Sequence, residues 1–371
     1  MTLDAVKQKS RKKAGRRAFE ANILDGLTDA VILIDENKIF VDGNAAAFDL
    51  LGSESKGLGL AVVFDGGDVV EAVDAVLKGG QERQGEIQLP PPVSRICEMR
   101  VIELPARNPE NAAWIMLVLR DVTDARKTEQ MRADFVSNVS HEFRSPVSSL
   151  LGFIETLQGP AHDDAEARDR FLGIMEGEAR RMAYLVNDLL ILSQVEAEEH
   201  IQPNETVDIS EVLGEISTIL SSRAAERDMN IDLVMPEDLP AIAADKDELI
   251  QVFRNLIDNA INYGTHGSTI QIRAEDQGQV FETSEAMLAV SVTNQGPGIK
   301  QEDIQRLTER FYRVDKGRSR ATGGTGLGLA IVKHIVGRHR GILDIQSTMG
   351  ESTMGESTTF SVKLPTIQPP A

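Results

Sequence analysis

Apolar and polar positions divide the chain into three stretches with different periodicities. Over residues 19–122, short apolar runs alternate with polar turn residues, a pattern that indicates short strands mixed with a few helices. The segment 30–34 is one such run, and 39–41 follows it after a polar turn, so we predict two neighbouring strands. An alanine-rich helix ending at Leu51-Gly52 comes next, and the segments 95–104 and 112–120 are predicted as longer strands.

The second stretch is helical. Thr123 is a suitable N-cap for a first helix, Gly159-Pro160 ends it, and a second helix is predicted over residues 164–195. Apolar residues recur along both helices at steps of mostly three or four: Met131, Phe135, Val139, Phe143, Leu150, Ile154, Leu157, Phe171, Ile174, Met182, Leu185, Leu189 and Leu192. Two hairpins paired as a four-helix bundle would bury both stripes, so we predict a homodimer. The alternative is that the stripes pack against the flanking domains of the same chain.

The third stretch, residues 205–365, alternates helix and strand. Helices are predicted over 247–263 and 330–338, and strands over 269–274, 288–293, 342–347 and 359–364. A five-residue unit, Ser347-Thr348-Met349-Gly350-Glu351, is repeated immediately as residues 352–356. Because the repeat falls between two predicted strands, we interpret it as a lengthened hairpin loop and assign it no function.

Composition narrows the class of protein. The formal net charge of −19 excludes broad nucleic-acid binding, which requires concentrated Lys and Arg. The sequence shows neither a membrane-spanning apolar run nor a secretory signal, and its single cysteine, Cys97, fits a reducing compartment, so a cytoplasmic protein is expected. The basic leader, residues 1–18, is interpreted as solvated or, alternatively, as a juxtamembrane segment. It is the one part expected to contact a membrane.

A histidine in the first predicted helix has neighbours suited to catalysis. Taken alone, His141 would be an ordinary surface residue. Glu142 beside it can accept the imidazole proton, which leaves the other ring nitrogen a better nucleophile. Pro146 lacks an N–H, so the helix is expected to bend there and to give a second domain access to the imidazole.

Three polar or glycine-rich motifs follow in the third stretch. Asn255, Asn259 and Asn262 share one helical face, and amide oxygens are ligands suited to Mg2+. Residues 294–299 end a predicted strand with an asparagine and two glycines, a corner that can read a nucleotide base. The glycines of residues 323–328 open a helix, where free N–H groups and the helix dipole favour phosphates. Singly, each motif could also be a solvated helix or a simple turn.

In this order and spacing, the motifs resemble the H, N, G1, F and G2 boxes of histidine protein kinases, and among these the sensors of the phosphate-regulon type. The resemblance covers roughly residues 126–364, and the preceding region resembles a PAS sensor domain. Together, the two resemblances imply a multidomain α+β protein. The expected parts are a leader (1–18), a PAS α/β domain (19–123), a dimeric helical hairpin forming a four-helix bundle (124–198), an ATP-binding α/β sandwich of the histidine kinase/Hsp90-like type (205–366) and a tail (367–371).

The roles of individual residues are implied by the resemblance alone. His141 corresponds to the phosphoacceptor, Glu142 to the adjacent acid–base residue and Asn259 to the Mg2+ ligand. The positions that match nucleotide-binding residues are Asn255, Asn259, Tyr263, Asn294, Gly296, Gly298, Arg310, Phe311, Arg313, Gly324, Thr325, Gly326, Leu327 and Gly328. The resemblance implies ATP and Mg2+ as cofactors, autophosphorylation of His141, and transfer of the phosphoryl group to an aspartate of a response-regulator receiver domain, gated by the PAS domain.

Three positions depart from the family's usual pattern. Asn294 stands where Asp is usual, which removes a charge from the base contact. Asn262 replaces a frequent Lys, which removes a cation near the phosphates. Ser145 replaces Thr or Asn, which argues against dephosphorylation of the partner. These departures keep a non-catalytic scaffold with a degenerate ATP-binding domain open as an alternative. A chaperone-like or topoisomerase-like ATPase is a third, disfavoured by the position of His141 on the hairpin.

Overall fold

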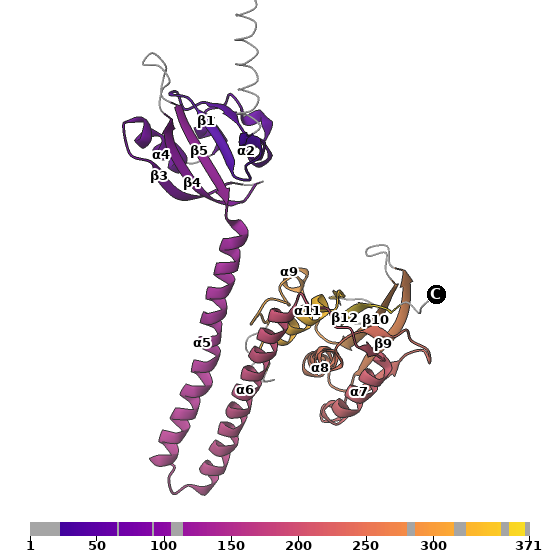
Figure 1. Ribbon diagram of the computed structural model, residues 1–371. Coiled ribbons are helices and arrows are strands. Elements are labelled where there is room, and N and C mark those ends of the chain that lie inside the picture. Colours follow the sequence, from indigo (N-terminus) through magenta and orange to yellow (C-terminus); the bar gives the residue numbers. More distant parts are fainter. Residues whose placement is uncertain are drawn as a thin grey trace, which may run out of the picture. The chain divides into compact units, whose positions relative to one another are not determined.

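The computed structural model describes residues 23–64, 67–90, 93–104, 114–279, 286–314, 324–349 and 356–367. The chain divides into two compact units, residues 1–134 and 135–371, and each is described by itself (Figure 1). The basic leader lies outside the described residues, as do Gly323, residues 350–355 of the repeat and the end of the tail.

The first unit is built on an antiparallel sheet with the strand order β2-β1-β5-β4-β3. Its strands are β1 (Ala30–Ile34), β2 (Phe40–Gly43), β3 (Arg83–Gln88), β4 (Ile96–Leu104) and β5 (Trp114–Asp121). The helices α2 (Ala45–Leu51), η1 (Ser53–Ser55), α3 (Leu60–Val63) and α4 (Gly67–Leu77) connect β2 to β3. Alternate residues of β5 (Ile115, Leu117 and Leu119) are buried, as in a sheet with one face on a core. This unit is compatible with a PAS domain.

Two groups in the core of this unit have clear structural roles. Asn44 caps α2, because its Oδ1 accepts hydrogen bonds from the N–H groups of Ala47 and of Val31 in β1. Cys97 lies in β4 and is fully buried, and this burial raises the pKa of its thiol to about 11. A thiol that stays neutral is a weak nucleophile, so we interpret Cys97 as a packing residue.

Two long helices form the predicted hairpin. The first, α5, spans Thr123–Gln158 and ends just before Gly159-Pro160, as predicted. It continues through Pro146 without interruption. The second, α6, spans Ala165–Glu198 and begins after Asp164, whose carboxylate caps its first turn. Each helix is long enough to carry several turns of the predicted apolar stripe.

The prediction that Thr123 caps α5 is wrong. Thr123 is the first residue of the helix, and its hydroxyl donates to Asp121 Oδ1 at 2.6 Å while it accepts from the Ile96 N–H at 2.9 Å. The hydroxyl is therefore used to tie the start of α5 to the ends of β4 and β5, instead of satisfying the helix's own N–H groups.

The C-terminal α/β domain contains a sheet with the strand order β11-β12-β10-β9-β7. Its strands are β7 (Asn230–Val234), β9 (Thr269–Gln279), β10 (Ala286–Gln295), β11 (Ile342–Thr348) and β12 (Ser357–Pro365). Three helices, α7 (Ile209–Ala225), α8 (Lys246–Tyr263) and α11 (Gly328–Arg338), pack on this sheet. The smaller elements are β6 (Thr206–Val207), β8 (Ile242–Ala243) and α9 (Gln301–Ile304). The predicted hairpin across the repeat is confirmed, because β11 and β12 pair up to Thr348 opposite Ser357.

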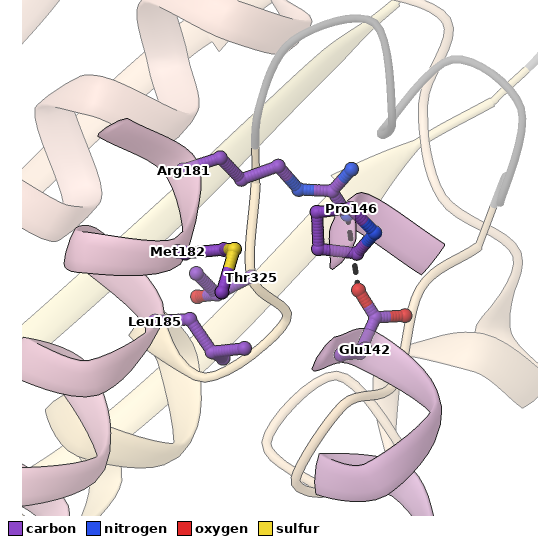
Figure 2. Close-up of a pocket in the computed structure, with 6 residues that line it drawn as sticks. All are labelled: Glu142, Pro146, Arg181, Met182, Leu185 and Thr325. Atoms are coloured by element: carbon purple, nitrogen blue, oxygen red, sulfur yellow. Dashed lines mark hydrogen bonds and ion pairs between the residues drawn. The ribbon is translucent and has the colours of Figure 1, made fainter. Parts of the chain in front are cut away.

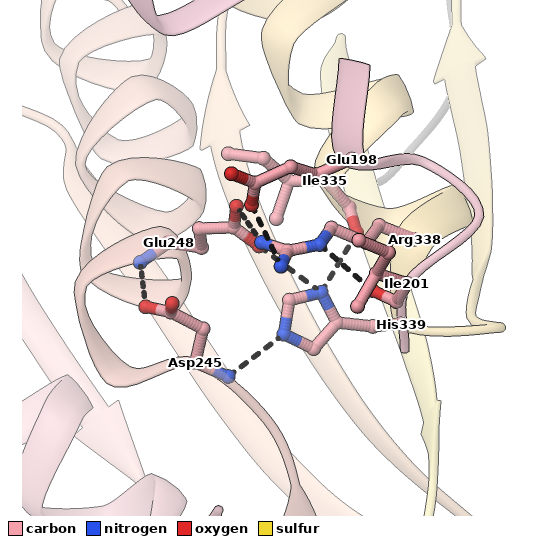
Figure 3. A network of polar contacts seen from close by, with 7 residues as sticks. All are labelled: Glu198, Ile201, Asp245, Glu248, Ile335, Arg338 and His339. Atoms are coloured by element: carbon pink, nitrogen blue, oxygen red, sulfur yellow. Dashed lines mark hydrogen bonds and ion pairs between the residues drawn. The ribbon is translucent and has the colours of Figure 1, made fainter. Parts of the chain in front are cut away.

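A buried arginine fastens the end of the hairpin to this domain (Figure 3). The Nε of Arg338, in α11, donates to the Ile201 carbonyl at 2.9 Å. Its guanidinium also pairs with Glu198 of α6 at 2.9 Å and with Glu248 of α8. The Arg338 side chain is only 9 % exposed. Three segments that are far apart in sequence therefore meet at one cation.

His339 completes this cluster as a neutral residue. Its Nε2 accepts from the Asp245 N–H at 3.1 Å, so Nδ1 carries the proton and donates to the Ile335 carbonyl at 2.8 Å (Figure 3). Burial lowers the pKa of His339, which favours this neutral form. The imidazole thus connects the start of α8 with α11.

Within the described residues, no helix combines the length and the apolar character that crossing a bilayer requires.

Candidate functional site

The residue that matches the phosphoacceptor lies on the surface of α5. His141 is exposed, so a second reactant can approach its imidazole. The side chain of Glu142 is directed to two arginines. Its Oε2 accepts from Arg181 of α6 at 3.0 Å (Figure 2) and from Arg313 of the C-terminal domain at 3.4 Å. Glu142 is therefore held by two guanidinium groups and not by the neighbouring imidazole.

The glycine segment, residues 324–328, contacts the hairpin directly. Thr325 Oγ1 donates to Asp188 Oδ2 of α6 at 2.7 Å, and the same oxygen accepts from the Leu327 N–H at 3.2 Å. Burial raises the pKa of Asp188, and the hydrogen bond from Thr325 opposes part of that rise. A small pocket lies between α5, α6 and the glycine segment (Figure 2). It is lined by Glu142, Pro146, Arg181, Met182, Leu185 and Thr325.

The F-box region, which contains Arg310, Phe311 and Arg313, contacts the glycine segment. The Phe311 N–H donates to the Gly326 carbonyl at 2.8 Å. A Cβ on Gly326, which has a φ of +76°, would lie 3.0 Å from the backbone of Phe311, so this contact requires glycine. The Phe311 ring packs against Phe135 of α5, and Arg310 pairs with Glu196 of α6 at 2.6 Å. The F-box region thus contacts both helices of the hairpin.

The asparagine helix, α8, meets the other end of the glycine segment. Asn255 Nδ2 donates to the carbonyl of Gly328, the first residue of α11, at 3.2 Å. Asn259 lies one turn further along and is partly exposed. Among the described residues its side chain has no hydrogen-bond partner, so its amide oxygen is available to a ligand. That oxygen is a hard donor of the kind that Mg2+ accepts.

A neighbouring helix supplies a cation at Asn262. Arg223 of α7 donates to Asn262 Oδ1 at 3.2 Å and to Asp258 Oδ1 at 2.7 Å. The Arg223 side chain is 42 % exposed. A positive charge therefore lies beside the position where the family pattern usually has Lys. The sequence alone could not show this, because the two residues are 39 positions apart.

The predicted base loop, residues 294–299, begins at the end of β10. Asn294 is 5 % exposed and donates a long hydrogen bond of 3.4 Å to the Gln295 carbonyl. A Cβ on Gly296 would lie 2.9 Å from the Tyr263 carbonyl, so the loop approaches the end of α8 closely. Tyr263 and the base loop are therefore neighbours.

Motifs that are far apart in sequence meet in pairs: Asn255 with Gly328, Phe311 with Gly326, and Tyr263 with Gly296. Arg310 belongs to none of these pairs, because its guanidinium contacts Glu196 and lies over the ring of Phe135. It faces the hairpin and not the other matched residues.

Three charged residues of α6 that contact matched residues were not predicted: Arg181, Asp188 and Glu196. Asp188 carried a readable signal, since it lies three residues after Leu185 and four before Leu192, on the apolar stripe. A charged residue at such a position requires a specific partner. Arg181 carried no such signal, because its partner is 39 residues away on α5.

Docking of the glycine segment on α6 is expected to weaken as the pH rises. The pKa of Asp188 is raised in the docked arrangement, so protonation of this carboxyl favours docking, and the contribution is lost as the pH rises through the raised pKa. Asp188→Asn remains neutral and should dock independently of pH. Hydrogen–deuterium exchange of residues 324–328, corrected for intrinsic rates, at pH about 5 and about 8 measures this. Equal pH dependence in both proteins would contradict the expectation.

Known families match both halves of this site. The His Kinase A (phospho-acceptor) domain matches residues 131–198, and the histidine kinase-, DNA gyrase B-, and HSP90-like ATPase matches residues 244–368. The phosphate regulon sensor protein PhoR of Pseudomonas aeruginosa is 35% identical over 336 residues, which cover 88% of this chain and 71% of PhoR.

Two further relatives are sensor kinases. The sensor histidine kinase WalK of Bacillus subtilis is 32% identical over 350 residues, 91% of this chain and 54% of WalK. The sensor-like histidine kinase SenX3 of Mycobacterium bovis is 34% identical over 258 residues, 70% of this chain and 60% of SenX3. The chain thus spans between 54% and 71% of the length of these relatives.

Fold and site together define the class, a protein-histidine kinase with a phosphoacceptor hairpin and a nucleotide-binding α/β domain. The identity and coverage of the relatives then specify the family: the chain belongs to the sensor histidine kinases of two-component systems.

Proposed function

We propose that this kinase phosphorylates its own His141 from ATP and passes the phosphoryl group to an aspartate of a response-regulator receiver domain. One observation above all supports His141. Arg313 of the nucleotide-binding domain pairs with Glu142, so that domain docks on the helical turn that carries the exposed imidazole. In the proposed step, a ring nitrogen attacks the γ-phosphorus, the bond to the bridging oxygen breaks, and ADP leaves.

The nucleotide is proposed to lie between α8 and the glycine segment, with its base at the base loop and Tyr263. N–H groups at the start of α11 would face the phosphates. Asn259 would hold Mg2+, because its amide oxygen is a suitable ligand and is not used within the described part of the chain. The ion would neutralise phosphate charge, and Arg223 beside Asn262 would add a second cation.

We assign the arrangement seen here to the resting enzyme. The carboxylate of Glu142 is engaged by Arg181 and Arg313, so it is not placed to accept a proton from His141. Thr325 is tied to Asp188 at the same time. Release of these contacts would free Glu142 and the glycine segment. The N-terminal unit, as a PAS domain continued by α5, would set how often release occurs, which requires two arrangements of similar energy.

Exposed apolar side chains support a homodimeric four-helix bundle. Val136, Leu151, Leu172 and Leu190 on the two helices of the hairpin are between 50 % and 65 % exposed. A second copy of the hairpin would remove such side chains from water. Sedimentation velocity at micromolar concentration tests this, and a monomer at every concentration would contradict it.

Incubation with γ-labelled ATP and Mg2+ tests the kinase proposal. We expect label that is lost in acid, stable in alkali and transferable to a receiver domain, as a phosphoramidate should be. An unlabelled wild-type chain would refute the proposal.

The second candidate function is a non-catalytic scaffold. It is suggested by the uncharged Asn294 in the base loop, which stands where the family usually has Asp. Calorimetric titration with MgATP discriminates between the two, because a scaffold with a degenerate domain would show no binding.

A further inference from the structure

The two ends of the five-residue repeat accept hydrogen bonds from the base loop. At one end of the base loop, the Ile299 N–H donates to Ser347 Oγ at 2.9 Å. Near the other end, the Gly296 N–H donates to the Glu356 carbonyl at 3.1 Å. Ser347 opens the first copy of the repeat and Glu356 closes the second. Both copies therefore contribute an acceptor to the same loop.

Close packing fills the space between these two hydrogen bonds. Gly298 has a φ of +65°, and a Cβ at this position would lie 2.6 Å from Met349 Cγ and 2.7 Å from the Thr348 carbonyl. The main chain of the base loop thus rests against the first copy of the repeat. A side chain at residue 298 would force the two apart.

The hydroxyl of Ser347 is held in place by β12. Its oxygen lies 2.8 Å from Thr358 Oγ1 and 3.2 Å from the Ser357 carbonyl. Its single proton is used toward one of these oxygens, so a lone pair remains for the Ile299 N–H. Ser347 therefore transmits the position of β12 to the base loop.

We infer that the two ends of the repeat form the rear support of the base loop and that Ser347 is a positioning residue for recognition of the adenine base. This inference rests on the proposed function, because it takes residues 294–299 as the loop that reads adenine. Asn294 pairs opposite Thr358 in the sheet, so Asn294, Thr358 and Ser347 lie on three adjoining strands. A shift of the base loop would displace the Asn294 amide and leave the glycine segment in place. The consequence is reduced discrimination between bases, with phosphoryl transfer preserved.

Ser347→Ala removes the acceptor of the Ile299 N–H. Calorimetry on the full chain should show ATP binding weakened about threefold to tenfold and GTP binding changed less than about twofold, so that the preference for ATP falls. The KM for ATP should rise while kcat stays constant, and Ser347→Thr, which keeps the hydroxyl, should restore both binding and KM. Ser357→Ala is the matched control. Within the described residues its hydroxyl contacts Thr348 and not the base loop, so ATP binding should be unchanged.

The repeat itself offers a second variant. Because the copies are identical, deletion of residues 352–356 keeps Ser347 and Met349 and places Glu351 where Glu356 stood. Thr348 can still pair opposite Ser357, and the connection shortens from eight residues to three, a common hairpin length. This variant should bind ATP within about twofold of wild type, because a lost hydrogen bond costs more than that and none of the anchors is lost.

Three outcomes would overturn the inference while the wild type binds ATP normally. They are an unchanged ATP preference in Ser347→Ala, an equal loss of ATP and GTP binding in that variant, or an equally large loss in the deletion variant. A wild-type chain that binds no ATP would overturn the proposed function as well, so the two failures are distinguishable.

Discussion

Replacing His141 by glutamine is expected to abolish acid-labile phosphorylation of the chain. The imidazole is the proposed nucleophile, and the amide of glutamine neither attacks phosphorus nor holds the phosphoryl group. Labelling by γ-labelled ATP should fall at least about 100-fold. Because the side chain is exposed on α5, its loss should leave folding intact and MgATP affinity within about twofold of wild type.

His162 provides a matched control on the same hairpin. It lies in the turn between α5 and α6, and its side chain is 71 % exposed. His162→Gln should label like the wild type, since within the described residues its one side-chain partner is the neighbouring Asp163. Normal labelling of His141→Gln, or loss of label in His162→Gln alone, would place the phosphoacceptor elsewhere.

Long amphipathic elements were predictable because their signals are local. The helix break at Gly159-Pro160 follows directly after the end of α5, and α8 begins one residue before the predicted start at residue 247. Strand β1 has the predicted bounds, 30–34. In each case periodicity and a terminating residue agree over a short span.

Some elements that depend on distant partners were not predicted. In β3, Ile87 is the single buried residue, so the alternation of a half-buried strand is missing, and pairing with β4 defines the strand. Helix α7 was also not predicted, although its sequence carries a local signal. Asp208 caps the helix, and apolar residues recur at helical spacing. The buried residues are Ile209, Val212, Leu213, Ile216, Leu220 and Ala224.

The residues of the candidate site also fall mostly into those with a local sequence signal, which were predicted, and those that depend on packing, which were not. Motifs such as those of Asn255 and Gly328 were found because their order and spacing along the chain match the family pattern, although each motif alone is ambiguous. Their charged neighbours were not found, because the contacts of Arg223 and Arg181 depend on how helices pack. Asn262 illustrates this, since the arginine that contacts it comes from another helix and is also paired with Asp258. A departure from a motif can therefore be judged only with the packing in view.

Replacing Arg338 by alanine is expected to destabilise the C-terminal domain by about 3–5 kcal/mol, the cost of leaving a buried ion without its partner. The side chain of Glu248 is 13 % exposed, and burial already raises its pKa while Arg338 opposes that rise. Without Arg338, the carboxylate is either buried unpaired or protonated. The Ile201 carbonyl and Glu198 also lose their contacts, so the end of the hairpin should detach.

The pH dependence and a second substitution test this explanation. Because the pKa of Glu248 is raised in the folded state, the destabilisation of Arg338→Ala should grow as the pH rises through that pKa and shrink below it. Glu248→Gln in the same background should recover part of the loss, since a neutral amide costs less to bury. Arg180→Ala, which breaks an exposed pair with Glu176, should change little. Urea unfolding at pH about 6 and about 8 measures all four proteins. A loss no larger than that of Arg180→Ala, or a double variant less stable than Arg338→Ala, would exclude the stranded carboxylate as the cause.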